Sequence, residues 1–205
     1  MNHPAPFILA FDTSEPRCIV TVSNGKHVLA QTVEEMAKGQ AERLMVLCEQ
    51  MLDQARVSQD TLSAIGVGIG PGNFTGTRIS VAAARGLALG LGIPAVGVSR
   101  FDSLRLGAQG PCACTVAAPR QQVYLQHFDG AGPNGTPQIM HVDELADVSV
   151  PVIGAGGQPA RYPLGEAIAR ITCARFERPG PRPAPLYLRP ADAAPASDKA
   201  PDMLS

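Results

Sequence analysis

The spacing of apolar residues changes abruptly near residue 40, and this change restricts the fold more than any other feature. Before it, three short apolar runs cover residues 7–11, 18–22 and 28–33, with turn residues between them. After it, apolar residues recur every three or four positions through 40–56, which predicts an amphipathic helix. Strands followed by helices along one chain are typical of a mixed sheet with helices packed on it.

The alternation of strands and helices continues to residue 106. Asn24-Gly25, between the second and third apolar runs, predicts a β-hairpin. Ser99 is a suitable N-cap for a short helix. The further predicted elements are strands at 64–69 and 93–98, a helix from residue 75 or 77 to 91, and a short helix at 99–106.

The pattern is weaker in the second half, where strands are predicted at 112–117, 123–128 and 150–153 and a loop at 130–136. That loop contains a G-x-G-x-x-G match, but a proline interrupts it and no helix follows, so it does not predict a dinucleotide site. Seven prolines in the last 27 residues predict an extended, partly disordered tail. We expect a first lobe at 1–106, a smaller second lobe at 107–178 and a proline-rich tail at 179–205.

Composition excludes several classes of function. The 17 basic and 18 acidic residues give a net charge of -1, which argues against gripping nucleic acid through bulk positive charge. Aromatic residues make up 4% of the chain, too few for a base-stacking platform. No apolar run reaches the ~18 residues of a membrane span, and no basic residue precedes an apolar segment at the N-terminus. The five cysteines form no C-x-x-C and no two histidines stand three or four apart, so we expect a cytoplasmic protein with reduced thiols and no metal site.

Two segments combine residue types that suit phosphate and a hydrated cation. A carboxylate at a strand end followed by two hydroxyl residues can hold a cation, and a glycine-rich turn entering a helix gathers free N–H groups. The alternative is ordinary: a local turn, and glycines that permit close packing of strand and helix. The candidate nucleotide- or phosphate-binding residues are Asp12, Thr13, Ser14, Gly70, Pro71, Gly72, Asn73, Thr75, Gly76 and Arg78.

The two long predicted helices carry a second kind of candidate. The first has an apolar stripe that includes Leu44, Leu47 and Met51, and the second has a face of small residues that includes Ala82 and Gly86. Such faces either pack on the protein's own sheet or meet a partner helix, and the sequence favours the core for the stripe. Arg78 and Arg85 lie on one face of the second helix, which suits a phosphate, a partner carboxylate or solvent. We include Leu44, Leu47, Met51, Ala82, Arg85 and Gly86 as candidate interface residues.

The chain resembles a known family over most of residues 7–128. The segments Ile8-Leu9-Ala10-Phe11-Asp12-Thr13-Ser14 and Gly70-Pro71-Gly72-Asn73-Phe74-Thr75-Gly76-Thr77-Arg78, with Pro185-Leu186-Tyr187-Leu188-Arg189 near the end, are similar to the bacterial TsaB (YeaZ) family. The resemblance implies a two-lobed actin-like, sugar-kinase-like (ASKHA) ATPase fold, with mixed sheets flanked by helices and a reduced second lobe. It also implies a role in placing threonylcarbamoyl on the adenosine beside the anticodon of tRNAs that read codons beginning with A.

The resemblance further implies a partner protein rather than the catalyst. A larger catalytic TsaD-like paralogue and a small TsaE-like ATPase are the expected partners, with a homodimer in isolation, tRNA contacted indirectly and no membrane. The chain itself is expected to require no cofactor, with ATP or ADP and Mg²⁺ acting in the complex. Two departures from the family pattern bear on these expectations. Gln40-Ala41-Glu42 stands for the family's His-Ser-Glu, which removes the histidine from the interface and leaves Glu42 as an interface candidate. Ala117-Ala118-Pro119 stands for Asp-Ala-Arg, which weakens a catalytic role.

Three hypotheses of different classes follow. The first is a non-catalytic partner and activator subunit. The second is a self-sufficient ATP-dependent kinase- or transferase-like enzyme that uses Asp12 and the Gly70–Arg78 loop. The third is a peptidase, which ranks last because the sequence offers no nucleophile with a base and no metal site.

Overall fold

The first lobe is built on a five-stranded sheet in the order β3-β2-β1-β4-β5. The computed structural model describes residues 5–130 and 132–188. Strands β1 to β3 are antiparallel neighbours, whereas β4 and β5 run parallel to β1. The predicted meander and its later parallel strands are therefore confirmed. The strands are β1 (Phe7–Glu15), β2 (Arg17–Ser23), β3 (Val28–Glu35), β4 (Leu62–Gly68) and β5 (Ala95–Val98).

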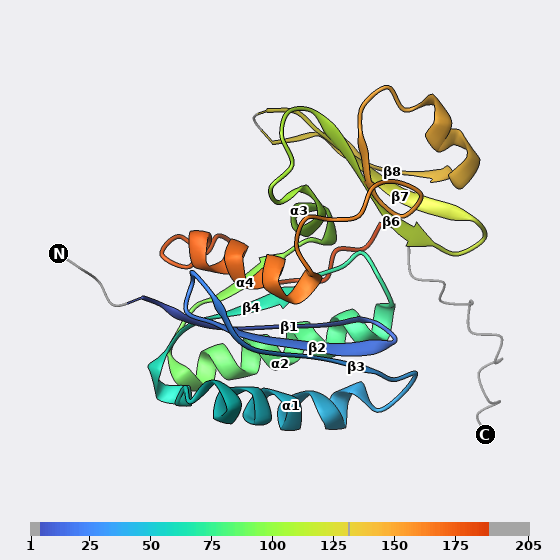
Figure 1. Ribbon diagram of the computed structural model, residues 1–205. Coiled ribbons are helices and arrows are strands. Elements are labelled where there is room, and N and C mark those ends of the chain that lie inside the picture. The colour runs from blue at the N-terminus through green and yellow to red at the C-terminus, as the bar shows by residue number, and fades with distance from the viewer. Residues whose placement is uncertain (1–4, 131, 189–205) are drawn as a thin grey trace, which may run out of the picture.

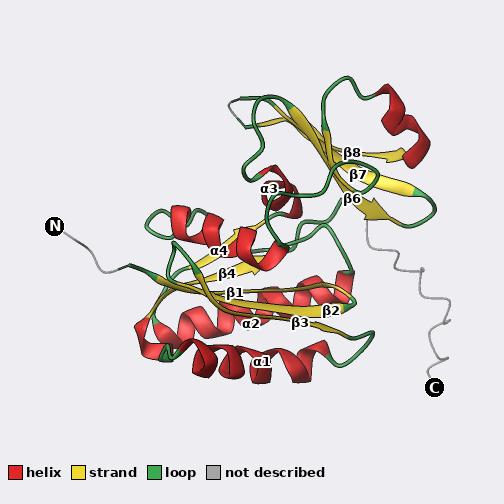
Figure 2. Cartoon of the chain, viewed as in Figure 1, coloured by secondary structure: helices red, strands yellow, loops and turns green. Residues whose placement is uncertain are grey.

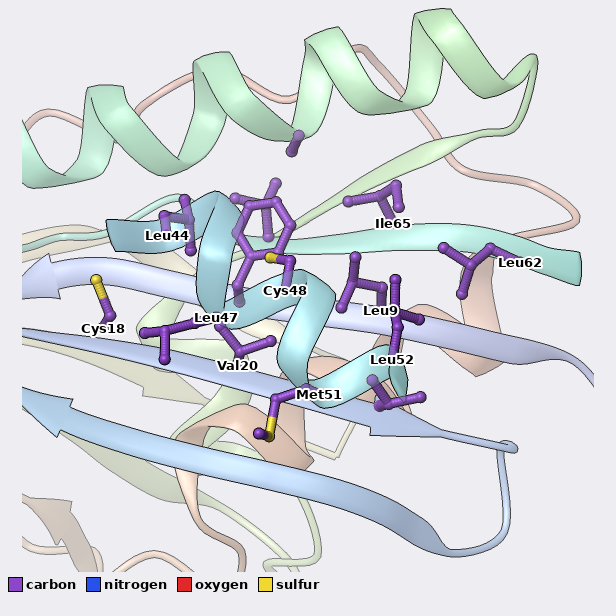
Figure 3. Packing of buried hydrophobic residues seen from close by; sticks show 14 of the residues in the cluster. Leu9, Cys18, Val20, Leu44, Leu47, Cys48, Met51, Leu52, Leu62 and Ile65 are labelled. Atoms are coloured by element: carbon purple, nitrogen blue, oxygen red, sulfur yellow. The ribbon is translucent and has the colours of Figure 1, made fainter. Parts of the chain in front are cut away.

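Two helices, α1 (Gln40–Ala55) and α2 (Phe74–Leu91), cover one face of this sheet (Figure 1). Figure 3 shows the apolar stripe of α1 directed at β1 and β2, among residues that are almost wholly buried. Leu44, Leu47 and Met51 belong to this cluster, with exposed fractions of 1%, 2% and 8%. The favoured interpretation of this stripe as core is thus confirmed, and the inclusion of these three residues among the interface candidates is wrong, because their side chains fill the protein's own core.

A third helix, α4 (Leu164–Arg175), covers the opposite face of the same sheet (Figure 1). Successive side chains of β1 point to opposite faces of the sheet. Leu9 and Phe11 belong to the apolar cluster between the sheet and α1, and Ile8 and Ala10 pack against α4. The sequence assigned all of 107–178 to the second lobe. The chain returns instead to the first lobe, because the apolar α4 face of the sheet needs a cover.

The second lobe holds a four-stranded sheet in the order β8-β7-β6-β9 (Figure 2). Predicted strands appear as β6 (Cys112–Ala118), β7 (Gln122–Phe128) and β9 (Val152–Gly154). The loop predicted at 130–136 is wrong in part, because β8 (Pro133–His141) begins inside it and pairs antiparallel with β7. The G-x-G-x-x-G match therefore lies in a hairpin and not in a strand–turn–helix unit.

Short helices complete the described chain. Helix α3 (Arg100–Arg105) leads from β5 toward the second lobe, and Ser99 caps it by accepting a hydrogen bond from the Asp102 N–H at 3.0 Å, as predicted. Two 3₁₀ helices, η1 (Gln59–Thr61) and η2 (Val142–Asp147), lie at other connections. Within the described residues, no helix is both long and apolar enough to cross a membrane.

The part of the predicted tail up to residue 188 is extended, as expected, and connects the two lobes. The Leu186 N–H donates to the carbonyl oxygen of Ile69 in the first lobe at 2.7 Å. The side chains of Leu186 and Leu188 pack into the apolar cluster of the second lobe that contains Phe101 and Val116. The predicted disorder falls on residues 189–205, which lie outside the described residues.

The seat of α4 on the sheet gives a test of the architecture. A Cβ at Gly66 of β4 would lie 2.3 Å from the Thr172 hydroxyl oxygen, whereas a Cβ at Gly90 of α2 would meet nothing within 4 Å. We expect Gly66→Ala to lower the free energy of unfolding by about 1–3 kcal/mol through overpacking. Gly90→Ala should raise it by up to about 1 kcal/mol through helix propensity. Urea unfolding of both variants measures the difference, and equal midpoints would contradict this packing.

Candidate functional site

A cleft of about 770 Å³ separates the two lobes. Its first-lobe wall combines polar and apolar groups, including Ser14, Glu15, Asn73 and Arg100, whereas its second-lobe wall is mainly apolar. The extended segment 186–188 lies along it as a third wall. The remaining lining residues are Pro16, Pro71, Gly72, Phe74, Val116, Ala117, Ala118, Pro119 and Tyr124.

Asp12 does not face this cleft. It lies inside β1 rather than after it, and its side chain has no exposed surface. Its Oδ1 atom accepts hydrogen bonds from the Ser14 N–H at 2.9 Å and from the Ser14 hydroxyl at 2.8 Å. Its Oδ2 atom packs against Gly68, where a Cβ would lie 1.8 Å away, and has no hydrogen-bond partner. Burial raises the pKa of this carboxyl above its ordinary value, although the charge of Arg100 lowers it in part.

The glycine-rich turn is closed against β1 instead of open to a ligand. The Asn73 N–H donates to the Ser14 carbonyl at 2.7 Å, and the Thr13 hydroxyl donates to the Gly76 carbonyl at 2.7 Å. A Cβ at Gly76 would lie 1.9 Å from the Thr13 carbonyl oxygen, and one at Gly72 would lie 2.6 Å from the Ser14 carbonyl oxygen. These glycines therefore serve the close approach of the turn to β1.

Helix α2 has its own cap at the same place. The Asn73 side-chain oxygen accepts from the Gly76 N–H at 2.8 Å, which satisfies one of the free donors of the first turn. The Thr77 N–H donates to the Asn73 carbonyl at 2.9 Å. The N–H groups of Gly76 and Thr77 at this helix end therefore already have partners within the protein.

Arg78 has an intramolecular partner. Its Nε donates to the Tyr187 hydroxyl at 2.7 Å, and its guanidinium carbon lies 3.7 Å from the centre of the Phe74 ring. The Phe74 and Tyr187 rings are 5.0 Å apart between centres. Sequence reasoning missed Tyr187 as a site residue, although the Pro185-Leu186-Tyr187-Leu188 motif marked it. Arg78 thus fixes the C-terminal segment to α2.

The described residues do not fit a magnesium-bound phosphate group. The carboxylate that would hold the cation is buried behind Ser14, and Arg78 is bonded to Tyr187. The second-lobe wall at 117–119 offers two alanines and a proline. Of the ten predicted nucleotide residues, four line the cleft, namely Ser14, Pro71, Gly72 and Asn73.

The predicted phosphate and interface residues meet in a second hollow. This hollow of about 550 Å³ lies where the N-terminal ends of α1 and α2 come together. Glu42 and Gln40 of the first helix line it together with Thr75 and Gly76 of the second. The structure thus places Glu42, which is exposed, beside the start of α2.

The outer face of α2 carries the most exposed large apolar residue among those described. Leu89 is 78% exposed, one turn from Gly86, and a Cβ at Gly86 or Gly90 would meet no atom within 4 Å. Ala82 and Gly86 are exposed and Arg85 is half-buried, so these three predicted interface residues remain accessible. Sequence reasoning missed Leu89, although it stands three residues after Gly86 on the same face.

The cysteines do not form an alternative reactive centre. Burial raises the pKa of the Cys18 thiol to about 11 and that of Cys48 to about 12, which disfavours the nucleophilic thiolate. Within residues 5–130 and 132–188, no group of three or more His, Cys, Asp or Glu side chains could hold a metal ion.

The buried carboxylate of Asp12, whose Oδ2 has no hydrogen-bond partner among the described residues, predicts that the stability of the protein depends on pH. Because its pKa is raised in the folded state, the native protein loses stability relative to an uncharged variant as pH rises above the unfolded value of about 3.8. Asp12→Asn keeps an oxygen for Ser14 and removes the buried charge. We expect its stability advantage over the parent chain to be larger at about pH 7.5 than at about pH 4. Urea unfolding at both pH values measures it; a variant that is less stable at neutral pH would contradict the prediction.

Comparisons with known proteins agree with the fold and define the family. A family model described as TsaD: tRNA N6-adenosine threonylcarbamoyltransferase matches residues 27–160. An uncharacterized protein of Mycobacterium tuberculosis is 32% identical over 92% of this chain and 94% of that protein. The tRNA threonylcarbamoyladenosine biosynthesis protein TsaB of Escherichia coli is 36% identical over 49% of this chain and 43% of its own length.

Solved structures share the same architecture. YeaZ from Pseudomonas aeruginosa is 25% identical with a TM-score of 0.68, over 89% of this chain and 100% of that chain. A second structure, described as similar to peptidase YEAZ from the same organism, has a TM-score of 0.71 at 22% identity and covers 90% of this chain and 100% of its own. The expected two-lobed ASKHA fold is confirmed. The chain belongs to the TsaB (YeaZ) family.

Proposed function

We propose that this protein is a non-catalytic partner subunit in the threonylcarbamoylation of tRNA. Its family membership supports a place in this modification, because relatives bear the name tRNA threonylcarbamoyladenosine biosynthesis protein. The finer proposal is that the chain binds and activates a larger TsaD-type transferase, with a small TsaE-type ATPase in the same assembly. The modified position is the adenosine next to the anticodon in tRNAs that read codons beginning with A.

The exposed face of α2 is the observation that carries this proposal. Leu89 leaves 78% of its surface in solvent, and the neighbouring glycines let another backbone approach closely. A helix face with a large apolar residue beside small ones suits helix-against-helix packing. The underside of α2 is held by the core, so the face is presented on a rigid support.

The partner would supply most of the contacts with tRNA. The chain has a net charge of -1, and strong binding to nucleic acid depends largely on positive charges that neutralise phosphates. In isolation the same α2 face would be available to a second copy of this chain, which makes a homodimer the competing state in a cytoplasmic setting. Formation of the heteromer would then require that the homodimer dissociate.

The self-sufficient ATP-dependent enzyme receives less support. That hypothesis gave Asp12 the role of cation ligand, yet the carboxylate is buried within β1. It also assigned Arg78 to phosphate binding, yet Arg78 donates a hydrogen bond to the Tyr187 hydroxyl. The peptidase hypothesis also receives less support. Among the described residues the cleft lining contains neither histidine nor cysteine, and the hydroxyl of its one serine, Ser14, donates to the buried Asp12 carboxylate.

A matched pair of surface substitutions tests the partner function. Leu89→Glu places a charge at the centre of the α2 face, and Ile139→Glu places one on β8, where the isoleucine is 38% exposed. The purified chain is mixed with the TsaD-type paralogue from the same genome, and association is measured by light scattering. We expect Leu89→Glu to weaken association by about tenfold or more, because a charge would be buried in the contact, and Ile139→Glu to leave it unchanged.

Transfer of threonylcarbamoyl to tRNA is followed on the same samples. The proposal requires that transfer depend on both chains and fall with Leu89→Glu in proportion to the lost complex. Unimpaired association of that variant would rule out α2 as the docking face. Transfer by this chain alone would rule out the non-catalytic role.

A further inference from the structure

A further cavity, separate from the interlobe cleft and from the hollow at the starts of α1 and α2, lies on the α4 side of the first sheet. It has a volume of about 440 Å³, which lies within the range of small-molecule sites. β2 and β3 form one wall, α3 a second and the entry to α4 a third. These elements belong to distant parts of the chain, so the cavity exists only once the fold is complete. It shares Arg100 with the cleft, but its other lining residues are its own.

The polar lining of this cavity is dominated by positive charge. Arg17 comes from β2 and Arg100 from the start of α3, and no carboxylate lines the cavity among the described residues. Both guanidinium groups contact the same carboxylate, that of Glu15, which lies on the cleft side. Glu35 is a weaker partner of Arg17, at 3.8 Å and with 71% of its side chain exposed.

The two arginines have more donors than these carboxylates accept. Each guanidinium carries five N–H donors, and the Nε of each lacks a hydrogen-bond partner within the described residues although it is buried. Asp12 lies near Arg100, but its Oδ1 is engaged by Ser14 and its Oδ2 makes no hydrogen bond. The Arg100 side chain is 14% exposed and that of Arg17 33%, so their unused donors lie in a partly desolvated site where an added anion would be bound favourably.

The rest of the lining suits a compact organic group attached to the anion. Ile19 and Leu104 provide apolar walls, and Tyr162 provides an aromatic one. Gly165, in the first turn of α4, lies so close to β2 that a Cβ there would be 2.3 Å from the Thr21 hydroxyl oxygen. The α4 end of the cavity is therefore held at a fixed distance from the arginines.

We propose that this cavity is a binding site for a small organic anion, recognised through a phosphate or carboxylate group by Arg17 and Arg100. Bidentate pairing of a guanidinium with either group is the strongest polar contact that such a site offers. A bound anion would join α3, the connection to the second lobe, to β2 of the first lobe. Occupancy would thus stabilise the lobes in their present arrangement. The inference does not rest on the proposed partner function.

Arginine side-chain NMR provides a direct test on the full chain. The Nε–Hε signals of Arg17 and Arg100 are followed while inorganic phosphate or acetate is added, against sodium chloride of equal ionic strength. We expect both signals to shift with one shared Kd, in the millimolar range or below, for at least one of the two probes. A response to phosphate identifies a phosphate-bearing ligand, and a response to acetate a carboxylate-bearing one.

Three variants distinguish specific binding of the anion from general charge effects and from misfolding. Arg17→Gln should weaken the response of Arg100 at least about tenfold, because one of two cooperating cations is lost. Val33→Trp, at a half-exposed position of the cavity wall, should block the response while both arginines remain. Arg178→Gln, at an exposed position away from the cavity, should leave it unchanged. Shifts no larger than those in chloride, or an unimpaired response in folded Val33→Trp, would overturn the proposal.

Discussion

The close approach of the glycine turn to β1 is the contact on which the rest of the molecule depends. Two backbone carbonyls of β1, those of Thr13 and Ser14, occupy the space that side chains at Gly76 and Gly72 would need. Hydrogen bonds in both directions then lock the start of α2 to the end of β1. This contact sets the position of α2 and of its outer face. The same contact uses the Thr13 hydroxyl and the Asn73 N–H within the fold, so one arrangement both supports α2 and engages groups that the sequence assigned to phosphate.

Much of the first lobe could be predicted from local patterns. The α1 stripe from Leu44 to Leu52 has strong apolar residues at helical spacing, and the Asn24-Gly25 turn has the backbone freedom that its hairpin needs, with φ of 82° at Gly25. Helix α4 was missed because its apolar face relies on alanine, threonine and isoleucine, which give a weak periodic signal. Strand β8 was missed because it contains two prolines and a glycine, which an edge strand tolerates and a central strand does not.

The candidate site was harder to predict because its chemistry depends on which way each side chain points, and residue type alone does not determine this. The sequence places Gly76 and Arg78 correctly at the start of a helix, but it places Asp12 at the end of a strand, whereas Asp12 lies inside β1. Whether a carboxylate faces a cleft or the next strand is decided by where β1 ends, and β1 continues to Glu15. Arg100 and Tyr187 escaped notice for the same reason, since their partners, Glu15 and Arg78, are distant in sequence.

The return of α4 to the first sheet has a consequence for the order in which the protein can mature on the ribosome. The α4 face of the sheet, with Ile8, Ala10, Ala64 and Val98, has no cover until residues 164–175 have been synthesised. The first lobe therefore cannot complete its core before the second lobe has left the exit tunnel. Nascent chains shorter than this expose an apolar surface that invites chaperones or aggregation. A protein whose lobes are interleaved in this way completes its first lobe only after α4 has emerged, and fragments cut at the lobe boundary would leave the α4 face of the first sheet uncovered.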